Sequence, residues 1–208
     1  MLLTGYILSI PVFADSALLI MNPLNKVLSS KAGVSFAGTT AALALGLTAS
    51  HTMVPPTPGP IAAAGILGAD LGSVMIWGLL ISSISLVACY FFATKLASRI
   101  NVPITLEAVT TQQEQPALWK SLQNSGIADT ITSEFTGMEL GLFLPFLLAA
   151  CLKTTQGSST VALVTTASII APLMPALGLN DPFMATMTVL SIGAGASVVS
   201  HVNDNLPE

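Results

Sequence analysis

The chain has 208 residues, of which 52% are hydrophobic and only 8% are charged, and its mean hydropathy is +0.80. A typical soluble domain carries a charge on about 25% of its residues, so this chain has too few ionisable side chains to cover a water-facing surface. The net charge of -4, without any basic run, excludes the clustered Lys and Arg that bind nucleic acid. The composition therefore predicts an integral membrane protein.

The first apolar stretch, residues 2–22, is interrupted by Pro11 and Asp15. It lacks a basic start, so we do not expect a cleaved signal peptide. A helix broken at Pro11 would expose backbone carbonyls near the Asp15 carboxylate and could form a cation or proton site. An interfacial helix cap is the alternative. The next stretch, residues 32–50, is uncharged and rich in Ala, Gly and Thr, which favours close helix packing in membranes.

A proline-rich segment, HTMVPPTPGPIAAAGILGADLG, follows at residues 51–72. Its prolines at 55–60 exclude a regular helix there, and the apolar run after them is only about 12 residues long, too short to cross a bilayer. We therefore predict a re-entrant half-helix whose irregular backbone is buried in protein or lines a wet cavity. His51 could titrate near neutral pH or lie at the interface, and Asp70 is typical of a loop or cap.

The clearest membrane span is residues 73–94, an uncharged run of about 22 residues. Residues 32–94 contain no Lys or Arg. We expect the basic residues on either side of this region to lie in two loops. The first loop contains Lys26 and Lys31, and the second contains Lys95, Arg99 and Lys120. If residues 51–72 enter and leave on one side, both basic loops share the other side, which the positive-inside bias makes cytoplasmic.

Residues 95–137 form the one long polar stretch and are predicted to be a loop. The apolar pattern then resumes in three runs, at 138–152, 161–178 and 183–200. Cys89 and Cys151 lie in apolar stretches without the spacing of a zinc site, and we expect no metal and no cofactor.

The first two of these runs are separated by KTTQGSST, residues 153–160. A cation, hydroxyls, an amide and a flexible glycine fit the break of a discontinuous membrane helix, where they could bind a polar solute. A helix beginning at Ser158–Ser159 would favour an anion, whereas an ordinary tight turn is the alternative. The last run ends in GAGASVVSHVND, which is either a second polar site or a loop that caps a helix.

Four segments resemble the gluconate permease family of proton-coupled sugar-acid symporters, and they occur in the family's order. They are IPVFADSALLIMNPL at 10–24, residues 51–72, TTQGSSTVALVTTASIIAPL at 154–173 and IGAGASVVSHVND at 192–204. The resemblance implies a fold of the ion-transporter superfamily, with two inverted repeats and re-entrant hairpins. It also implies an organic acid substrate such as gluconate, and coupling to protons.

The predicted substrate and ion site combines the family positions with the polar residues found above. Prolines would support the loop, hydroxyls and amides would contact the solute, and His or Asp would handle protons. The site residues are Asp15, His51, Pro55, Pro56, Pro58, Gly59, Thr155, Gln156, Gly157, Ser158, Ser159, Thr160, Ser200, His201, Asn203 and Asp204, and Pro60 completes the proline motif.

Members of the resembled family are roughly twice as long as this chain, which implies a truncated and internally deleted permease. We expect an all-α integral membrane protein with about five to six transmembrane helices plus re-entrant half-helices, the remnant of an inverted-repeat transporter. Its regions would be a first membrane half at 1–94, the polar loop at 95–137 and a second membrane half at 138–208.

The predicted function is proton-coupled symport of a small organic acid in the bacterial inner membrane, and the protein could form a homo-oligomer. A non-transporting permease fragment is the first alternative. An intramembrane hydrolase using Ser158 or Ser200 is the second, but adjacent Ser200 and His201 point about 100° apart on a helix. No catalytic sequence motif supports it, so we predict that the chain is not an enzyme.

Overall fold

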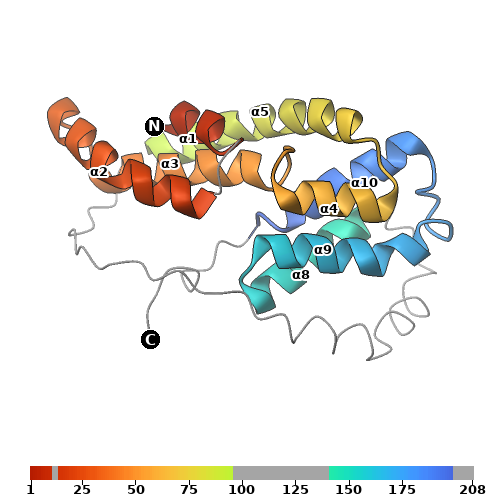
Figure 1. The fold of residues 1–208 in the computed structure, drawn as a ribbon. Helices are drawn as coiled ribbons and strands as arrows, with labels where there is room; N and C mark the ends of the chain where they lie inside the picture. Colours follow the sequence, from red (N-terminus) through yellow and green to blue (C-terminus); the bar gives the residue numbers. More distant parts are fainter. Residues whose placement is uncertain (11–13, 96–140, 199–208) are drawn as a thin grey trace. The chain divides into compact units, whose positions relative to one another are not determined.

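The structure, a computed structural model, describes residues 1–10, 14–95 and 141–198, and every regular element in these ranges is helical (Figure 1). The predicted all-α class is confirmed for this part of the chain. Two compact units divide the chain: the first comprises residues 1–61 and 71–106, and the second comprises residues 62–70 and 107–208.

The first unit is built around α3 (Phe36–His51), which contacts α1 (Leu2–Leu8), α2 (Ala14–Ala32) and α5 (Leu71–Lys95). Helices α3 and α5 run antiparallel, with the start of α3 beside the end of α5 (Figure 1). The backbones of α1 and α3 approach closely because glycines lie between them: a Cβ at Gly5 would lie 2.6 Å from the Leu43 carbonyl oxygen, and one at Gly46 would collide with the Leu2 carbonyl.

Polar side chains link the helices of the first unit. The Tyr6 hydroxyl of α1 lies 2.8 Å from Ser82 Oγ of α5, and Ser50 Oγ of α3 donates a hydrogen bond to the Tyr6 carbonyl at 2.9 Å. Between α2 and α3, Asn25 Nδ2 donates to Thr40 Oγ1 at 3.0 Å. These bonds matter in an apolar solvent, since a polar group without a partner is costly there.

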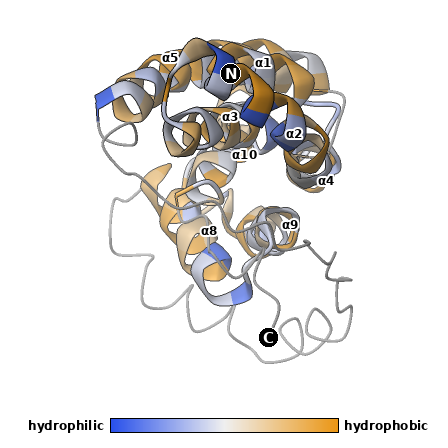
Figure 2. Ribbon diagram, turned by 90° about the vertical axis from the view of Figure 1, so that its left-hand side faces the viewer, coloured by the Kyte–Doolittle hydropathy of each residue, from blue (hydrophilic) through white to orange (hydrophobic). Residues whose placement is uncertain are grey.

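Helix α5 confirms the predicted span at 73–94 as a segment able to cross a membrane. It has 25 residues with a mean hydropathy of 2.1 over its best window, and Figure 2 shows it as largely hydrophobic. Most of its large apolar side chains are exposed, among them Ile76, Ile84 and Val87. Among the described residues α5 is the one helix that satisfies both the length and the composition of a span, so the predicted five to six crossings remain a prediction.

Two boundaries in the first half differ from the sequence prediction. Lys26 and Lys31, expected in a loop, lie within α2, and Lys31 is in its last turn, where a cation is favourable. The prediction that the prolines at 55–60 exclude a regular helix is wrong for the end of that range, because α4 (Pro58–Leu67) begins at Pro58 and contains Pro60. Proline is tolerated in the first helical turn, where the backbone N–H groups have no helical acceptor. With 10 residues, α4 has the predicted half-helix length.

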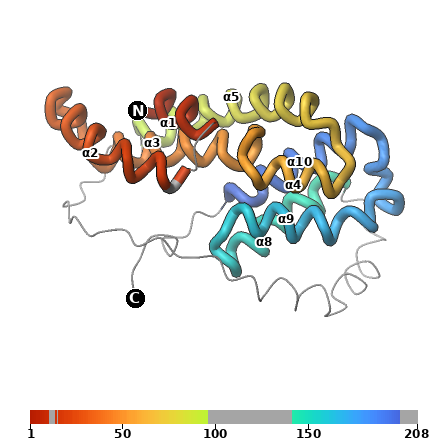
Figure 3. The backbone as a smooth tube through the Cα atoms, in the orientation of Figure 1, coloured from red at the N-terminus to blue at the C-terminus, as the bar shows by residue number. Residues whose placement is uncertain are grey.

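The second unit contains α8 (Phe143–Gln156), α9 (Ser159–Ile170), the 3₁₀ turn η2 (Ala171–Leu173) and α10 (Pro182–Gly195), and α8 contacts both α9 and α10. The tube in Figure 3 shows the sharp reversal between α8 and α9. Helices α8 and α10 cross at a glycine, since a Cβ at Gly195 would collide with the Phe146 carbonyl. Ser191 Oγ also donates to the Leu142 carbonyl at 2.5 Å.

Candidate functional site

The polar segment at 153–160 contains a helix break that is narrower than predicted. Helix α8 continues through Gln156, and the break consists of Gly157 and Ser158 before α9 begins at Ser159. Gly157 has φ +78, a conformation that residues with a Cβ rarely adopt. Ser158 caps α9, because its Oγ accepts a hydrogen bond from the Val161 N–H at 3.4 Å.

Lys153 fixes the geometry of this break. Its side chain is only 3% exposed, and Nζ donates a hydrogen bond to the Gly157 carbonyl. The Gly157 N–H in turn donates to the Lys153 carbonyl at 2.9 Å. Both backbone polar groups of the glycine are therefore bonded to one residue of α8. The sequence shows Lys153 as a cation between apolar runs, but its burial and its bond to Gly157 are visible only in three dimensions.

The other polar side chains of the segment divide into two groups. Thr154 and Thr155 are exposed, and their hydroxyls donate to α8 carbonyls, those of Ala150 at 2.7 Å and Leu152 at 3.0 Å. Gln156, by contrast, has a buried Oε1 with no hydrogen-bond partner among the described residues. Of the predicted positions, the Gln156 amide oxygen thus lacks a hydrogen-bond partner among the described residues, while the Thr155 hydroxyl is occupied by its own helix.

The C-terminal end of α10 meets this break. Ser159 Oγ donates a hydrogen bond to the carbonyl of Ala196, the residue that caps α10, at 3.2 Å. Thr160 follows Ser159 in the first turn of α9 and is partly buried. The C-terminal end of α10 therefore lies close to the Gly157 break. The predicted site residues Ser200, His201, Asn203 and Asp204 lie outside the described residues.

The proline-rich segment forms a buried turn in the first unit. His51 is the last residue of α3, and its carbonyl accepts a hydrogen bond from Thr57 Oγ1 at 2.8 Å. Most of the turn between them is buried, including Pro55, whereas Pro56 is exposed; the peptide bond between these two prolines is cis. Pro58, Gly59 and Pro60 lie in the first turn of α4. The irregular backbone is thus buried in protein, as predicted.

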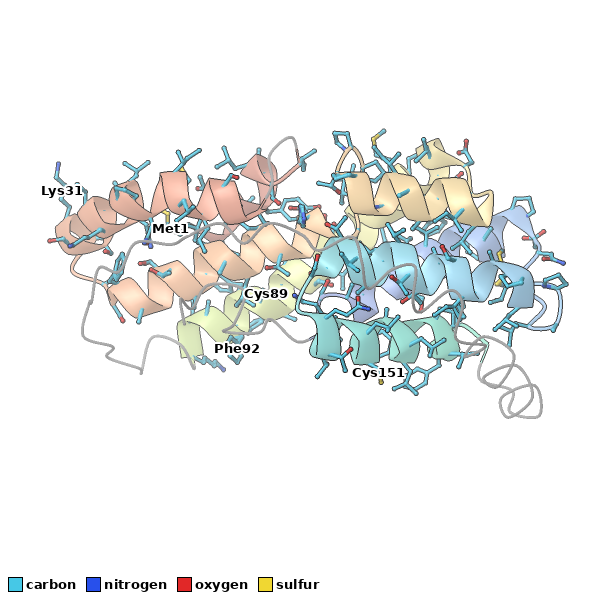
Figure 4. The ribbon with its side chains drawn as sticks, turned by 60° about the horizontal axis from the view of Figure 1, so that its bottom comes forward. Met1, Lys31, Cys89, Phe92 and Cys151 are labelled. Carbon is cyan, nitrogen blue, oxygen red and sulfur yellow. The ribbon has the colours of Figure 1, made fainter. Side chains whose placement is uncertain are left out.

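Two predicted acidic positions lie at helix starts. Asp15 is the second residue of α2, after the interruption that separates α2 from α1. Asp70 directly precedes α5, in agreement with its interpretation as a loop or cap residue. Within the ranges that the structure describes, no group of three or more His, Cys, Asp or Glu side chains could hold a metal ion. Cys151 is exposed on α8 and points away from α9 (Figure 4).

Comparison with known protein families shows which family the chain belongs to. Residues 1–122 and 114–206 match the sequence profile of the GntP family permeases, so nearly the whole chain is covered. The chain belongs to this family and is therefore a membrane protein of the permease class. This confirms the resemblance drawn from the proline-rich and Gln-Gly-Ser-Ser segments.

The chain spans only part of the relatives that it matches. An uncharacterized permease of Haemophilus influenzae is 37% identical over 112 residues, which is 54% of this chain and 22% of that protein. A gluconate permease of Pseudomonas aeruginosa is 35% identical over 82 residues, 39% of this chain and 18% of that protein. A gluconate permease of Bacillus licheniformis is 21% identical across 97% of this chain and 68% of its own length. No solved structure matches the chain.

The match to the Bacillus licheniformis protein contains internal gaps in this chain. It extends over 307 positions, although this chain has 208 residues, so the relative contains internal residues that this chain lacks. The two profile matches meet at residues 114–122, within the polar stretch. The predicted internal deletion agrees with both observations.

Proposed function

We propose that the chain is a proton-coupled secondary transporter, a symporter, that carries gluconate or a related small organic acid across the bacterial inner membrane. The observation that carries this proposal is the α8–α9 break: a buried cation, a buried amide oxygen and a helix start gather at Gly157 in a chain of the permease family. Polar backbone at such a break can bind a charged solute inside a membrane. Two relatives are gluconate permeases by name.

The chemistry of the site gives each group a role in this proposal. The Gln156 amide and the hydroxyls of Ser158, Ser159 and Thr160 would hydrogen-bond the hydroxyl groups of the sugar acid. The N-terminus of α9 would favour its carboxylate. The prolines would hold the turn after α3. Proton transfer would involve the ionisable residues Asp15, His51, His201 and Asp204, with Ser200 and Asn203 as further solute contacts.

The proposed architecture has five to six crossings arranged as two inverted repeats, a first membrane half at 1–94, a loop at 95–137 and a second membrane half at 138–208. A parallel between the halves supports it. In each half a helix ends at an irregular segment and a short helix follows: α3 leads to α4, of 10 residues, and α8 leads to α9, of 12 residues. Helices of this length are too short to cross about 30 Å of hydrocarbon.

Uptake into proteoliposomes tests the proposal. The purified chain is reconstituted with an imposed proton gradient, acidic outside, and accumulation of radiolabelled gluconate is followed. We expect accumulation that a protonophore abolishes, and a strong reduction in Gln156→Ala. Thr154→Ala is the matched control, because the Thr154 side chain is exposed and bonded to its own helix. Accumulation that is insensitive to the protonophore would contradict proton coupling.

The second candidate is a permease fragment that binds the solute without transporting it. The specific observation in its favour is length, since the chain covers 22% and 18% of two relatives and lacks internal residues of a third. Ligand binding to the folded state raises its apparent stability, so a rise in Tm with gluconate but no accumulation at any gradient would favour the fragment. No response in either assay would exclude both candidates.

A further inference from the structure

A buried lysine holds the carbonyl of a glycine at the centre of the proposed site. Lys153 is 3% exposed, and its ammonium bonds to the carbonyl of Gly157, four residues further along the chain. The described residues include other lysines, Lys26, Lys31 and Lys95, and all three are exposed. Lys153 therefore stands apart from them by burial and by its position at a break.

Burial of a lysine is costly unless the ammonium has acceptors. A glycine carbonyl is a neutral acceptor, whereas a carboxylate is a charged acceptor that binds an ammonium more strongly and at a shorter distance. The bond from Lys153 to Gly157 is therefore one that an organic anion reaching the break could replace. The partially charged N–H groups at the start of α9 would favour the same anion.

The bond also determines the backbone of the break. Gly157 is bonded to Lys153 through both its N–H and its carbonyl, and it has φ +78, which a single glycine can leave at little cost. The neighbouring Gln156 Oε1 is buried and has no hydrogen-bond partner in the described part of the chain. A change at the Gly157 carbonyl would thus alter the position of the residues that contact the solute.

We propose that Lys153 selects carboxylate-bearing solutes by exchanging the Gly157 carbonyl for the solute carboxylate, and that this exchange releases the α8–α9 break. The inference rests on the proposed function, because it assumes that an organic acid binds at this break. In the empty protein the ammonium holds Gly157 in place. In the bound protein it pairs with the anion, and the Gly157 carbonyl becomes free to move.

Selectivity between a charged and a neutral ligand tests the exchange. The full chain in lipid nanodiscs is titrated with gluconate and with sorbitol, a polyol of equal carbon number without a carboxylate. We expect the unaltered chain to prefer gluconate, and Lys153→Met to lose about tenfold to a hundredfold in gluconate affinity while its weak sorbitol binding is unchanged. Lys153→Arg keeps the cation and should retain most of the preference.

A second measurement leaves Lys153 unaltered, so it does not depend on the folding of a variant. Amide hydrogen exchange over residues 153–161 is compared with gluconate, with sorbitol and without ligand. We expect gluconate alone to change exchange at the amides of Gly157 and Ser158. An equal change with gluconate and with sorbitol would contradict the exchange, because sorbitol has no carboxylate that could replace the Gly157 carbonyl.

The outcomes separate the two proposals. If the unaltered chain binds no carboxylate, both the proposed function and the role of Lys153 are overturned. If it binds gluconate and Lys153→Met keeps the same preference over sorbitol, only the role of Lys153 is overturned. An unchanged exchange pattern at Gly157 in the presence of bound gluconate would likewise reject the exchange of partners.

Discussion

At the scale of single residues, Gly157 allows the chain to reverse between α8 and α9. Its φ of +78 is strained for any residue with a Cβ. We expect Gly157→Ala to lower the free energy of unfolding by about 1–2 kcal/mol, measured by denaturant titration in detergent. Gly65→Ala is the control, since Gly65 lies in α4 with open space around it and alanine is the better helix former. Equal stability of the two variants would argue against a strained break.

The Tyr6 hydroxyl offers a second residue-scale prediction. It lies 2.8 Å from Ser82 Oγ, which also donates to the Gly78 carbonyl at 2.6 Å. Ser82 keeps that partner after Tyr6→Phe, so we expect a loss of only about 0.5–1.5 kcal/mol in the free energy of unfolding. Tyr90→Phe should have no effect, because Tyr90 is 56% exposed.

A double-mutant cycle with Ser82→Ala tests whether the loss comes from this contact. If the Tyr6–Ser82 hydrogen bond links α1 to α5, the summed losses of unfolding free energy in the two single variants should exceed the loss in the double variant. Strictly additive losses would show that the two hydroxyls act independently.

Sequence patterns predict which polar residues belong to the site, but not their hydrogen bonds or their burial. The hydroxyl-rich segment around Gly157 was visible as a polar interruption, and the break lies inside it. The pattern could not show that Thr155 bonds to its own helix, because local back-bonding depends on the helix continuing through Gln156. It could not show the burial of Lys153 either, since burial depends on packing between helices distant in sequence.

At the scale of helices, apolar length predicted α5 well because an uncharged run of that length has few alternatives. Shorter elements were less certain. The prolines at 58 and 60 suggest a helix break in the sequence, but they occupy the start of α4. Proline breaks a helix in its interior and is tolerated in its first turn. Lys26 and Lys31 suggest a loop in the sequence, whereas α2 continues through Ala32.

The packing of α1 on α3 depends on a glycine that leaves room for a backbone. A Cβ at Gly46 would collide with the Leu2 carbonyl, which is part of α1 and cannot move alone. We expect Gly46→Ala to separate the two helices and to cost about 1–3 kcal/mol of unfolding free energy, measured by the same titration. Gly65→Ala again serves as the control. No loss of stability would mean that α1 is displaced at little cost.

At the scale of the whole molecule, the sequence identifies the family more completely than it identifies the topology. The family profile matches residues 1–122 and 114–206, although the chain covers only 22% and 18% of two relatives. The number of crossings depends on every helix, and residues 96–140 and 199–208 lie outside the described structure. The chemistry of a motif can thus be inferred from a short segment of the chain, whereas the membrane topology requires that every membrane-spanning helix be known.

Topology nevertheless has a testable consequence in the first unit. Helices α3 and α5 are antiparallel (Figure 1), so Lys31, shortly before α3, and Lys95, at the end of α5, lie at the same end of the unit. Asp70 lies at the opposite end of α5, about 37 Å away along a helix of 25 residues. The positive-inside bias therefore predicts that the two lysines face the cytoplasm and that Asp70 faces the outside.

Cysteine labelling in intact cells measures this arrangement. Lys31→Cys, Lys95→Cys and Asp70→Cys are made in a background without Cys89 and Cys151, and each is treated with a membrane-impermeant maleimide. All three native side chains are exposed. We expect Asp70→Cys to react in intact cells, and the two lysine positions to react only after permeabilisation. Reaction of the two lysine positions from opposite sides would contradict an antiparallel α3–α5 pair spanning the membrane, because both positions belong to one end of that pair.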